Sequence, residues 1–522
     1  MNTELLRQIK EKGLLLEKEL FDLLNSFDDP EATKTLLENL QRFSGQKILT
    51  KASLSKNIEY IQRAAGELDS THKKSVESVF VKLGISLEIS KTLTLDNNKH
   101  VDLEPQTSYS IHYSDTKADK KLDISDFVGN FRSRYQQLQR ILINRPQLKN
   151  LISINKISAD RQAISFIGIV TEKRITKNKN MMIKFEDLTG EISGLIKMDN
   201  KELSPIANEL QLDDIVGVRA SGNRDLLFVH EIIFPDAHIP NRTMFKDEVC
   251  VAFLSDVHAG SDRHLGKSFE RFLDWVNSDD ETAKKIKYVF FTGDNVDGVG
   301  IFPGQENFLR LKSMKEQYAL LASYLRRMPK HITMFMCPGQ HDASRVAEPQ
   351  PLVDKRYAPE LYEIENLVLV TNPTLVKLYN KGVEFKVLMY HGASIHSFIN
   401  EIQELREMKA HRSPAKAVRH MLKRRHLAPT HSTVTYIPNA NKDPLVIEEV
   451  PDVLCTGEVH RLDIENYNGV LIITGSCWQA QTAFEEKVGN IPDPAKVPVL
   501  NLKTRELKVF DFGVEEEINN EY

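Results

Sequence analysis

The sequence is poor in cysteine, in long apolar runs and in excess charge of one sign. Its four cysteines form no CxxC pair among 522 residues, which excludes a zinc ribbon or a disulfide framework and predicts a reducing, cytoplasmic setting. No apolar run is long enough to cross a bilayer, and the charged stretch MNTELLRQIKEKG lacks the apolar core of a signal peptide. The net charge of −4 does not indicate a nucleic-acid binder. Any DNA contact must therefore come from local basic groups or metal ions.

The length predicts a multidomain protein, since single cores seldom grow beyond about 300 residues. The pattern of helices and strands along the chain predicts the α+β class. In residues 1–75, leucines recur at helical spacing and predict a helical N-terminal module. Residues 76–128 include the polar stretches DNNKH and DTKADKK and predict a linker. The acidic residues 513–522 predict a disordered tail.

Residues 129–245 begin with a predicted helix and continue as about five short strands separated by polar turns. This pattern predicts an OB-fold β-barrel. One loop is rich in lysine and asparagine, which suits binding of single-stranded DNA, with Phe166 or Phe185 stacking on bases. The basic residues proposed for this contact are Arg174, Lys177, Lys179 and Lys184. The alternative is that the aromatic rings fill the barrel and the loop is only solvated, or that the barrel is a docking surface.

Residues 246–512 alternate strands with helices and predict an α/β sandwich. Five apolar strands each run directly into a polar cluster: VCVAFLSDVH, KYVFFTGDNVDG, ITMFMCPGQHD, FKVLMYHGAS and DVLCTGEVHR. Loops at strand ends are rigidly placed and can converge on one site. The candidate metal ligands in these clusters are Asp256, His258, Asp294, Gln340, His391, Glu458 and His460. Carboxylate, imidazole and amide ligands suit Mn²⁺, Fe²⁺ or Zn²⁺, and the absence of thiolates argues against a structural zinc site.

The ligand clusters indicate a reaction as well as a site. Two ions about 3.5–4 Å apart can activate a water molecule, hold a phosphate and stabilise the leaving oxygen. This arrangement suits phosphodiester hydrolysis. His341 is the candidate for protonating the leaving oxygen, with Asp342 placed to orient its ring.

The motifs SDVH, GDNVDG, PGQHD, HGAS and GEVH resemble those of the calcineurin-like metallophosphoesterases. Longer segments resemble, more narrowly, the small subunit of the archaeal D-family DNA polymerase, which is related to the B-subunits of eukaryotic replicative polymerases. These segments are GQHDASRVAEPQP, SPAKAVRHMLKRRHLAPTHS, VIEEVPDVLCTGEVHR and ITGSCWQAQTAFEEKVGNIPDPAKVPV. The resemblance covers residues 130–522, and residues 1–125 match in layout only.

The resemblance implies a proofreading 3′→5′ exonuclease in a heterodimeric replicative polymerase whose large catalytic subunit synthesises DNA. Its substrate would be single-stranded DNA or a frayed primer terminus, its location cytoplasmic and nucleoid-associated, and its N-terminal helices could bind other replication factors. Two divalent ions are implied, with Mn²⁺ favoured and Fe²⁺, Zn²⁺ or Mg²⁺ as alternatives. The first would be held by Asp256, His258, Asp294 and His460 (the first metal position). The second would be held by Asp294, Gln340, His391 and Glu458 (the second metal position).

Two residues depart from the superfamily pattern, and both fall on the second metal position. Asparagine is common where Gln340 stands, and histidine where Glu458 stands. Glutamine offers the same amide oxygen on a longer arm, whereas glutamate adds a negative charge that alters metal preference. We expect an active nuclease with a modified second position. The competing hypotheses are a catalytically weakened scaffold subunit, and a phosphoesterase for small molecules or phosphoproteins, which the attached barrel disfavours.

Residues 405–426 form a basic segment, LREMKAHRSPAKAVRHMLKRRH, with an apolar stripe at helical spacing. One reading is a solvated helix that packs by its stripe. The other is that Arg424 and Arg425 contact phosphate near the nuclease cleft, or that the helix docks on an acidic surface of the large subunit.

Overall fold

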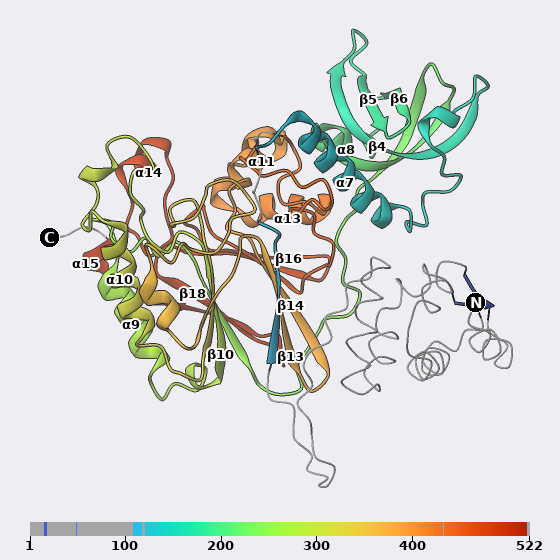
Figure 1. The fold of residues 1–522 in the computed structure, drawn as a ribbon. Coiled ribbons are helices and arrows are strands. Elements are labelled where there is room, and N and C mark those ends of the chain that lie inside the picture. The colour runs from blue at the N-terminus through green and yellow to red at the C-terminus, as the bar shows by residue number, and fades with distance from the viewer. Residues whose placement is uncertain (1–14, 18–47, 50–107, 117–120, 432, 519–522) are drawn as a thin grey trace. The chain divides into compact units, whose positions relative to one another are not determined.

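The computed structural model describes residues 15–17, 48–49, 108–116, 121–431 and 433–518 (Figure 1). The chain divides into two compact units, residues 1–102 and 103–522. In the first unit, the two-residue strands β1 (Leu15–Leu16) and β2 (Ile48–Leu49) pair in parallel. Most of the predicted helical module lies outside the described residues. All other elements discussed below belong to the second unit.

A closed five-stranded barrel occupies the region in which the sequence predicts short strands, with strand order β4-β5-β6-β8-β7. Its elements are β4 (Gln162–Ile175), β5 (Met181–Asp187), β6 (Gly190–Ile196), β7 (Ile215–Gly222), β8 (Leu227–Ile233) and the helix α8 (Leu203–Glu209) between β6 and β7. Phe166 and Phe185 are 0% exposed and their ring centroids lie 5.5 Å apart inside the barrel. The predicted stacking of these rings on bases is therefore wrong, because they fill the core.

Two six-stranded sheets pack face to face in the remainder of this unit. Their strand orders are β12-β11-β10-β9-β18-β19 and β16-β17-β15-β14-β13-β3. The strands are β3 (Ser108–Tyr113), β9 (Cys250–Leu254), β10 (Ile286–Thr292), β11 (Thr333–Cys337), β12 (Leu367–Leu369), β13 (Thr374–Asn380), β14 (Val383–Met389), β15 (Val453–Thr456), β16 (Asp463–Tyr467), β17 (Val470–Thr474), β18 (Lys496–Asn501) and β19 (Leu507–Asp511). A buried apolar cluster that includes Phe253, Phe290 and Val387 fills the space between the sheets.

Helices cover the outer faces of both sheets (Figure 1). Helices α9 (Gly266–Val276) and α10 (Met314–Leu325) share a core with the first sheet. Helices α11 (Ile395–Glu401), α12 (Gln403–Glu407) and α13 (Ala415–Arg424) share a core with the second. The result is an α/β sandwich of four layers, as the alternation of strands and helices predicts. Among the described residues, no helix has both the length and the apolar character needed to cross a membrane.

Part of the predicted linker is ordered strand and helix. Strand β3 pairs antiparallel with β13 at the edge of the second sheet. Its alternating sequence SYSIHY places Ile111 against the core and sets the ring of Tyr109 5.0 Å from that of Phe335. Helix α7 (Ile124–Leu142) then begins at a capping box formed by Asp123 and Asp126. The linker prediction is thus wrong at residues 108–113, because two alternate side chains suffice to anchor a short edge strand.

The acidic tail is also partly ordered. Helix α15 (Glu515–Ile518) places the carboxylate of Glu517 at the start of α9, where it accepts hydrogen bonds from the backbone N–H groups of Lys267 and Ser268 at 2.9 and 2.8 Å. These N–H groups have no partner within their own helix, and a carboxylate is favoured at a helix N-terminus. The prediction of a disordered tail is therefore wrong for this turn.

Candidate metal centre

The two sheets bring the ends of several parallel strands to one place. Strands β9, β10 and β11 run parallel in one sheet, and β14, β15 and β17 run parallel in the other. Polar loops follow the carboxyl ends of five of these strands. Parallel strands present their carboxyl ends at one edge of a sheet, where ligand sites commonly lie. All seven predicted metal ligands come together there.

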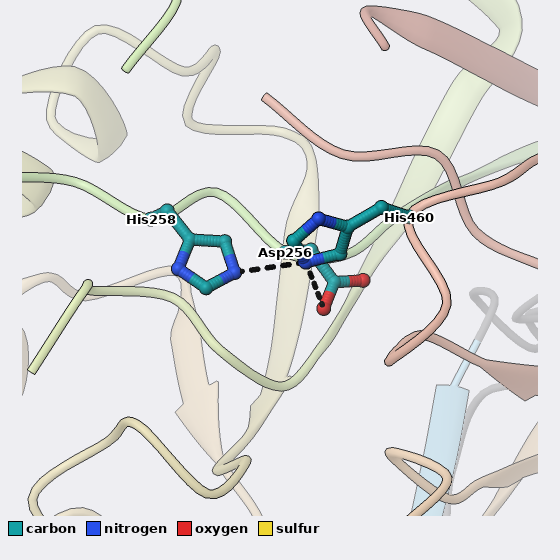
Figure 2. Close-up of side chains that lie close together, drawn as sticks. All are labelled: Asp256, His258 and His460. Carbon is teal, nitrogen blue, oxygen red and sulfur yellow. Dashed lines mark hydrogen bonds and ion pairs between the residues drawn. The ribbon is translucent and has the colours of Figure 1, made fainter. Parts of the chain in front are cut away.

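The first metal position gathers two imidazoles and a carboxylate (Figure 2). The Nε2 atoms of His258 and His460 lie 3.1 Å apart, and Nε2 of His460 is 3.7 Å from Oδ1 of Asp256. One ligand atom from each of these three residues lies within 4.8 Å of the others. Two ring nitrogens that face each other beside a buried carboxylate form a donor set suited to a divalent cation.

The second metal position lies around His391. Its Nε2 atom is 3.2 Å from Oδ2 of Asp294 and 3.2 Å from Oε2 of Glu458. The amide Nε2 of Gln340 donates a hydrogen bond of 2.7 Å to the same Oε2 of Glu458. Asp256, Asp294 and His391 form a second group of ligand atoms within 4.8 Å of one another. The two carboxylates at 256 and 294 thus place the two positions side by side.

Two buried atoms test whether these residues fit metal ions. Oδ2 of Asp256 and Oε1 of Gln340 have no hydrogen-bond partner among the described residues. Leaving a buried polar atom without a partner costs about 1–3 kcal/mol. Each of these atoms belongs to a predicted ligand, and a cation at either position would satisfy it. The donor set therefore fits two divalent ions.

The histidines of the first metal position are held by carboxylates on their outer sides. Nδ1 of His258 lies 3.0 Å from Oδ1 of Asp297, and Nδ1 of His460 lies 3.0 Å from Oε1 of Glu485. Such contacts fix the tautomer and present Nε2 to the metal. Neither Asp297 nor Glu485 is among the site residues predicted from the sequence. Glu485 lies on α14 (Ala483–Val488), 25 positions from its partner, and no local motif connects the two.

His391 and His341 are held by backbone carbonyls instead. Nδ1 of His391 lies 2.9 Å from the carbonyl oxygen of Thr292, and Nδ1 of His341 lies 2.6 Å from that of Asp297. Nε2 of His341 is thereby turned toward the centre, 3.9 Å from Oδ2 of Asp294. This placement suits a group that reaches the substrate without ligating either ion.

The structure corrects the predicted role of Asp342. Its carboxylate is buried and accepts hydrogen bonds from the backbone of Asn295 and Gly339, from the side chain of Asn295, and from the hydroxyl of Tyr318. The ring of His341 meets the carbonyl of Asp297 through its Nδ1 instead. Asp342 therefore holds two site loops together and does not orient the general-acid candidate.

The backbone of the centre is strained at its ligands. Asp256, His258, Asp294, Glu458 and His460 all have positive φ angles, between 46° and 75°. Non-glycine residues rarely adopt this conformation, and it costs about 1–3 kcal/mol at each position. Five such residues at one place indicate that the surrounding fold enforces the ligand geometry.

One glycine shows how tightly the loops approach. A Cβ atom at position 339 would lie 2.2 Å from Oδ1 of Asp294. Only a residue without a side chain allows the loop after β11 to pass this close to the carboxylate of Asp294.

The electrostatics of the centre favour positive charge. Burial opposes protonation of His391, but the carboxylate of Asp294 outweighs it and raises the pKa of His391 well above its usual range. Burial likewise opposes protonation of His460, and its contacts with Glu485 and Asp256 raise that pKa to about 9. Burial raises the pKa of Asp256, because removing its carboxylate from water disfavours the charged form. Cations at the two positions would relieve this imbalance.

The predicted nucleic-acid contacts divide into two groups. Arg174, Lys177 and Lys179 lie exposed on and beside the hairpin of β4 and β5, with Arg174 3.3 Å from Glu172. Lys184 pairs with Glu191 at 2.8 Å. The exposed hairpin keeps its basic groups accessible to a phosphate backbone.

The phosphate contacts predicted for the basic helix do not agree with the structure. Arg424 is 3% exposed, and its Nε donates to Asp214 at 2.8 Å and its guanidinium also meets Glu209. Arg425 is 5% exposed and donates to the carbonyls of Ile447 and Glu448. Both guanidiniums are themselves buried and hydrogen-bonded within the protein, so neither is available to DNA. Arg424 instead joins α13 to the barrel.

Comparisons with known proteins give the following similarities. A family described as the B-subunit of DNA polymerase alpha/epsilon matches residues 251–462. The DNA polymerase II small subunit of Methanothermobacter thermautotrophicus is 36% identical over 394 residues, which cover 74% of this chain and 80% of that one. That of Pyrococcus furiosus is 35% identical over 402 residues, covering 75% of this chain and 64% of its own length, so the chain spans less than two thirds of this relative. A solved archaeal phosphodiesterase matches 50% of this chain and 99% of its own at 12% identity, with a TM-score of 0.25, too low to bear on the fold.

Proposed function

This chain belongs to the family of archaeal DNA polymerase II small subunits, and from that membership we propose that it supplies a metal-dependent 3′→5′ exonuclease. The observation that carries the proposal is the convergence of seven ligand side chains with two buried oxygens that lack hydrogen-bond partners among the described residues. A subunit with only a scaffold role would not need five residues in strained backbone conformations around such atoms.

The proposed roles follow from the geometry. Asp256, His258, Asp294 and His460 would hold the first ion, and Asp294, Gln340, His391 and Glu458 the second. When bound, two divalent ions supply a nucleophilic water and neutralise the charge of the phosphodiester. His341 would give a proton from Nε2 to the leaving 3′ oxygen, because the carbonyl of Asp297 holds its Nδ1 and turns Nε2 inward.

The substrate and the partner are proposed from the family and from the barrel. An editing nuclease receives an unpaired 3′ end, which fits single-stranded DNA or a frayed primer terminus. The barrel has the strand number of an OB-fold, and we assign single-strand binding to its hairpin through Arg174, Lys177 and Lys179. Its relatives are named small subunits of a polymerase, so the proposed partner is a large subunit that performs DNA synthesis.

The test uses the purified chain, alone and with its large subunit, incubated with Mn²⁺ and a 5′-labelled single strand. We expect a ladder of products shortened one nucleotide at a time from the 3′ end. The control is Asp294→Ala, which removes the carboxylate shared by the two ions. A scaffold role would be indicated if the wild-type complex digested no more DNA than this control. If the protein hydrolysed a small phosphodiester but not DNA, it would be a small-molecule phosphoesterase.

A further inference from the structure

We propose that Gln340 and Glu458 work as one unit at the second metal position. In this unit, Glu458 is a ligand that also fixes the amide of Gln340 so that the amide oxygen faces the ion. The carboxylate of Glu458, in place of an imidazole, also raises the affinity of this position for hard ions such as Mn²⁺ or Mg²⁺ relative to its affinity for Zn²⁺. The inference rests on the proposed metal centre and concerns which ions it holds.

The orientation of the Gln340 amide follows from its contact with Glu458. The two side chains meet at 2.7 Å, Nε2 to Oε2. A carboxylate only accepts hydrogen bonds, and of the two ends of an amide only the nitrogen donates. Rotating the amide by half a turn would place its oxygen against the carboxylate and replace attraction by repulsion. The contact therefore directs Oε1 of Gln340 away from Glu458, where it is buried and has no hydrogen-bond partner among the described residues.

Glu458 is itself fixed on several sides. Its backbone has φ 75°, and its N–H donates to Oδ1 of Asp256 at 3.2 Å. Its Oε2 lies 3.2 Å from Nε2 of His391, and its Oε1 lies 3.6 Å from Nε2 of His396. A carboxylate with both oxygens engaged cannot swing toward solvent without losing these contacts. It can therefore act as a fixed reference for the amide.

The two residues depend on each other's length and chemistry. An asparagine at position 340 is one methylene shorter, so it could not keep its oxygen in place and also reach the carboxylate at 458. A glutamine at 340 without an acceptor at 458 would have an amide free to present either end. Together, the two residues provide an oxygen ligand of fixed orientation at the second metal position. Either residue without the other would not.

The resulting donor sets differ between the two positions. The second has oxygen donors from Asp294, Gln340 and Glu458 and a single imidazole, His391. The first has two imidazoles. Carboxylate and carbonyl oxygens suit Mg²⁺ and Mn²⁺, whereas imidazole-rich sites suit Zn²⁺ and other borderline ions. The charge of Glu458 also strengthens the attraction of a hard cation more than that of a softer one, since hard ions bind mainly through charge. The two positions should therefore differ in metal preference.

The experiment measures Mn²⁺ and Zn²⁺ binding to the full chain by calorimetry, with the electron paramagnetic resonance spectrum of bound Mn²⁺ as a second readout. The variants are Glu458→Gln, Glu458→Ala, Gln340→Leu and the double variant of the last two. Glu363→Gln, on an exposed glutamate, is the matched control. No DNA is present, so the outcome does not depend on nuclease activity.

We expect Glu458→Ala and Gln340→Leu each to weaken binding of the second Mn²⁺ by about 10–100-fold, and the double variant to lose less than the two losses combined. Glu458→Gln keeps an acceptor oxygen for the amide but loses the charge, so it should retain two bound Mn²⁺ while its preference for Mn²⁺ over Zn²⁺ falls at least tenfold. Because Glu458→Gln preserves the shape of the side chain, it tests the inference even if the alanine variant does not fold.

Two results would overturn the inference. One is an additive loss in the double variant, which would mean that the residues act independently. The other is an unchanged preference for Mn²⁺ over Zn²⁺ in Glu458→Gln. A chain that shows the expected coupling but no nuclease activity would refute the proposed exonuclease and leave the inference standing. An active nuclease without coupling would support the proposed exonuclease and refute the inference.

Discussion

Nδ1 of His258 lies 3.0 Å from the carboxylate of Asp297, while Nε2 of the same ring faces His460 at 3.1 Å. The imidazole is therefore held from behind with its second nitrogen directed into the first metal position. Asp297 also offers its carbonyl oxygen to His341. One residue thus orients both a proposed ligand and the proposed general acid.

Replacing Asp297 by asparagine should weaken the first metal position without removing any ligand. Outer contacts of this kind typically contribute 10–100-fold to metal affinity, and we expect a loss of that size for the first ion, measured by calorimetry with Mn²⁺. Asp262→Asn, an exposed carboxylate close in sequence to His258, is the control. Equal affinity in Asp297→Asn and the control would show that the carboxylate does not support the ligand.

Removing Arg424 should destabilise the chain and leave its DNA contacts intact. Arg424→Ala strands the buried carboxylate of Asp214, and breaking a buried pair of this kind costs about 3–5 kcal/mol. The free energy of unfolding in urea measures this loss. Arg326→Ala breaks the exposed pair with Glu363 and should cost no more than about 1 kcal/mol. A reduced salt dependence of DNA binding in folded Arg424→Ala would show that Arg424 contacts phosphate after all.

Stability should depend on pH through Glu209. Burial alone would raise the pKa of this carboxyl, but the hydrogen bond with His420 and the charges of Arg424 and Lys423 outweigh it and lower the pKa from 4.5 to about 2. The unfolded chain therefore binds this proton more readily than the folded chain. The stabilisation, about 3 kcal/mol, is fully present above pH 4.5 and is lost as the pH falls toward 2.

Urea unfolding of wild type and Glu209→Gln across this pH range checks the dependence. The difference in the free energy of unfolding between the two should be largest near neutral pH and should shrink between pH 4.5 and pH 2. Glu363→Gln, at an exposed pair, should show no such trend. A constant difference at all pH values would mean that Glu209 stabilises the fold through packing alone.

The barrel hairpin should contribute electrostatically to single-strand binding. For single-stranded DNA, each phosphate contact adds about 0.7 to the slope of log affinity against log salt. We expect the double variant Lys177→Gln with Lys179→Gln to lower this slope by about 1.4, measured by fluorescence anisotropy. The double variant Lys503→Gln with Lys508→Gln changes two exposed lysines of the sandwich and serves as the control. Equal slopes in the two variants would exclude the hairpin from the DNA path.

Much of the architecture could be predicted from the sequence because it depends on local pattern. Short strands with polar turns predicted the barrel region, and strands that alternate with helices predicted the sandwich. The exceptions are segments whose order comes from a distant partner. Strand β3 is anchored by β13, and Glu517 is held by the start of α9. Neither segment has enough apolar residues of its own to predict its structure.

By itself, the sequence determined which residues gather at the centre. Each of the seven ligand candidates follows a buried strand, and loops at strand ends can converge on one site, so the sequence alone was enough to predict one group. Asp256 follows β9 of one sheet and His391 follows β14 of the other, so their meeting depends on how the two sheets pack. Only the tertiary structure decided what holds these ligands and where the other charges go. Gln340 meets Glu458 across 118 positions, and Arg424 meets Asp214 across 210. Such contacts depend on which loops and domains the fold brings together, and no local spacing in the chain encodes them.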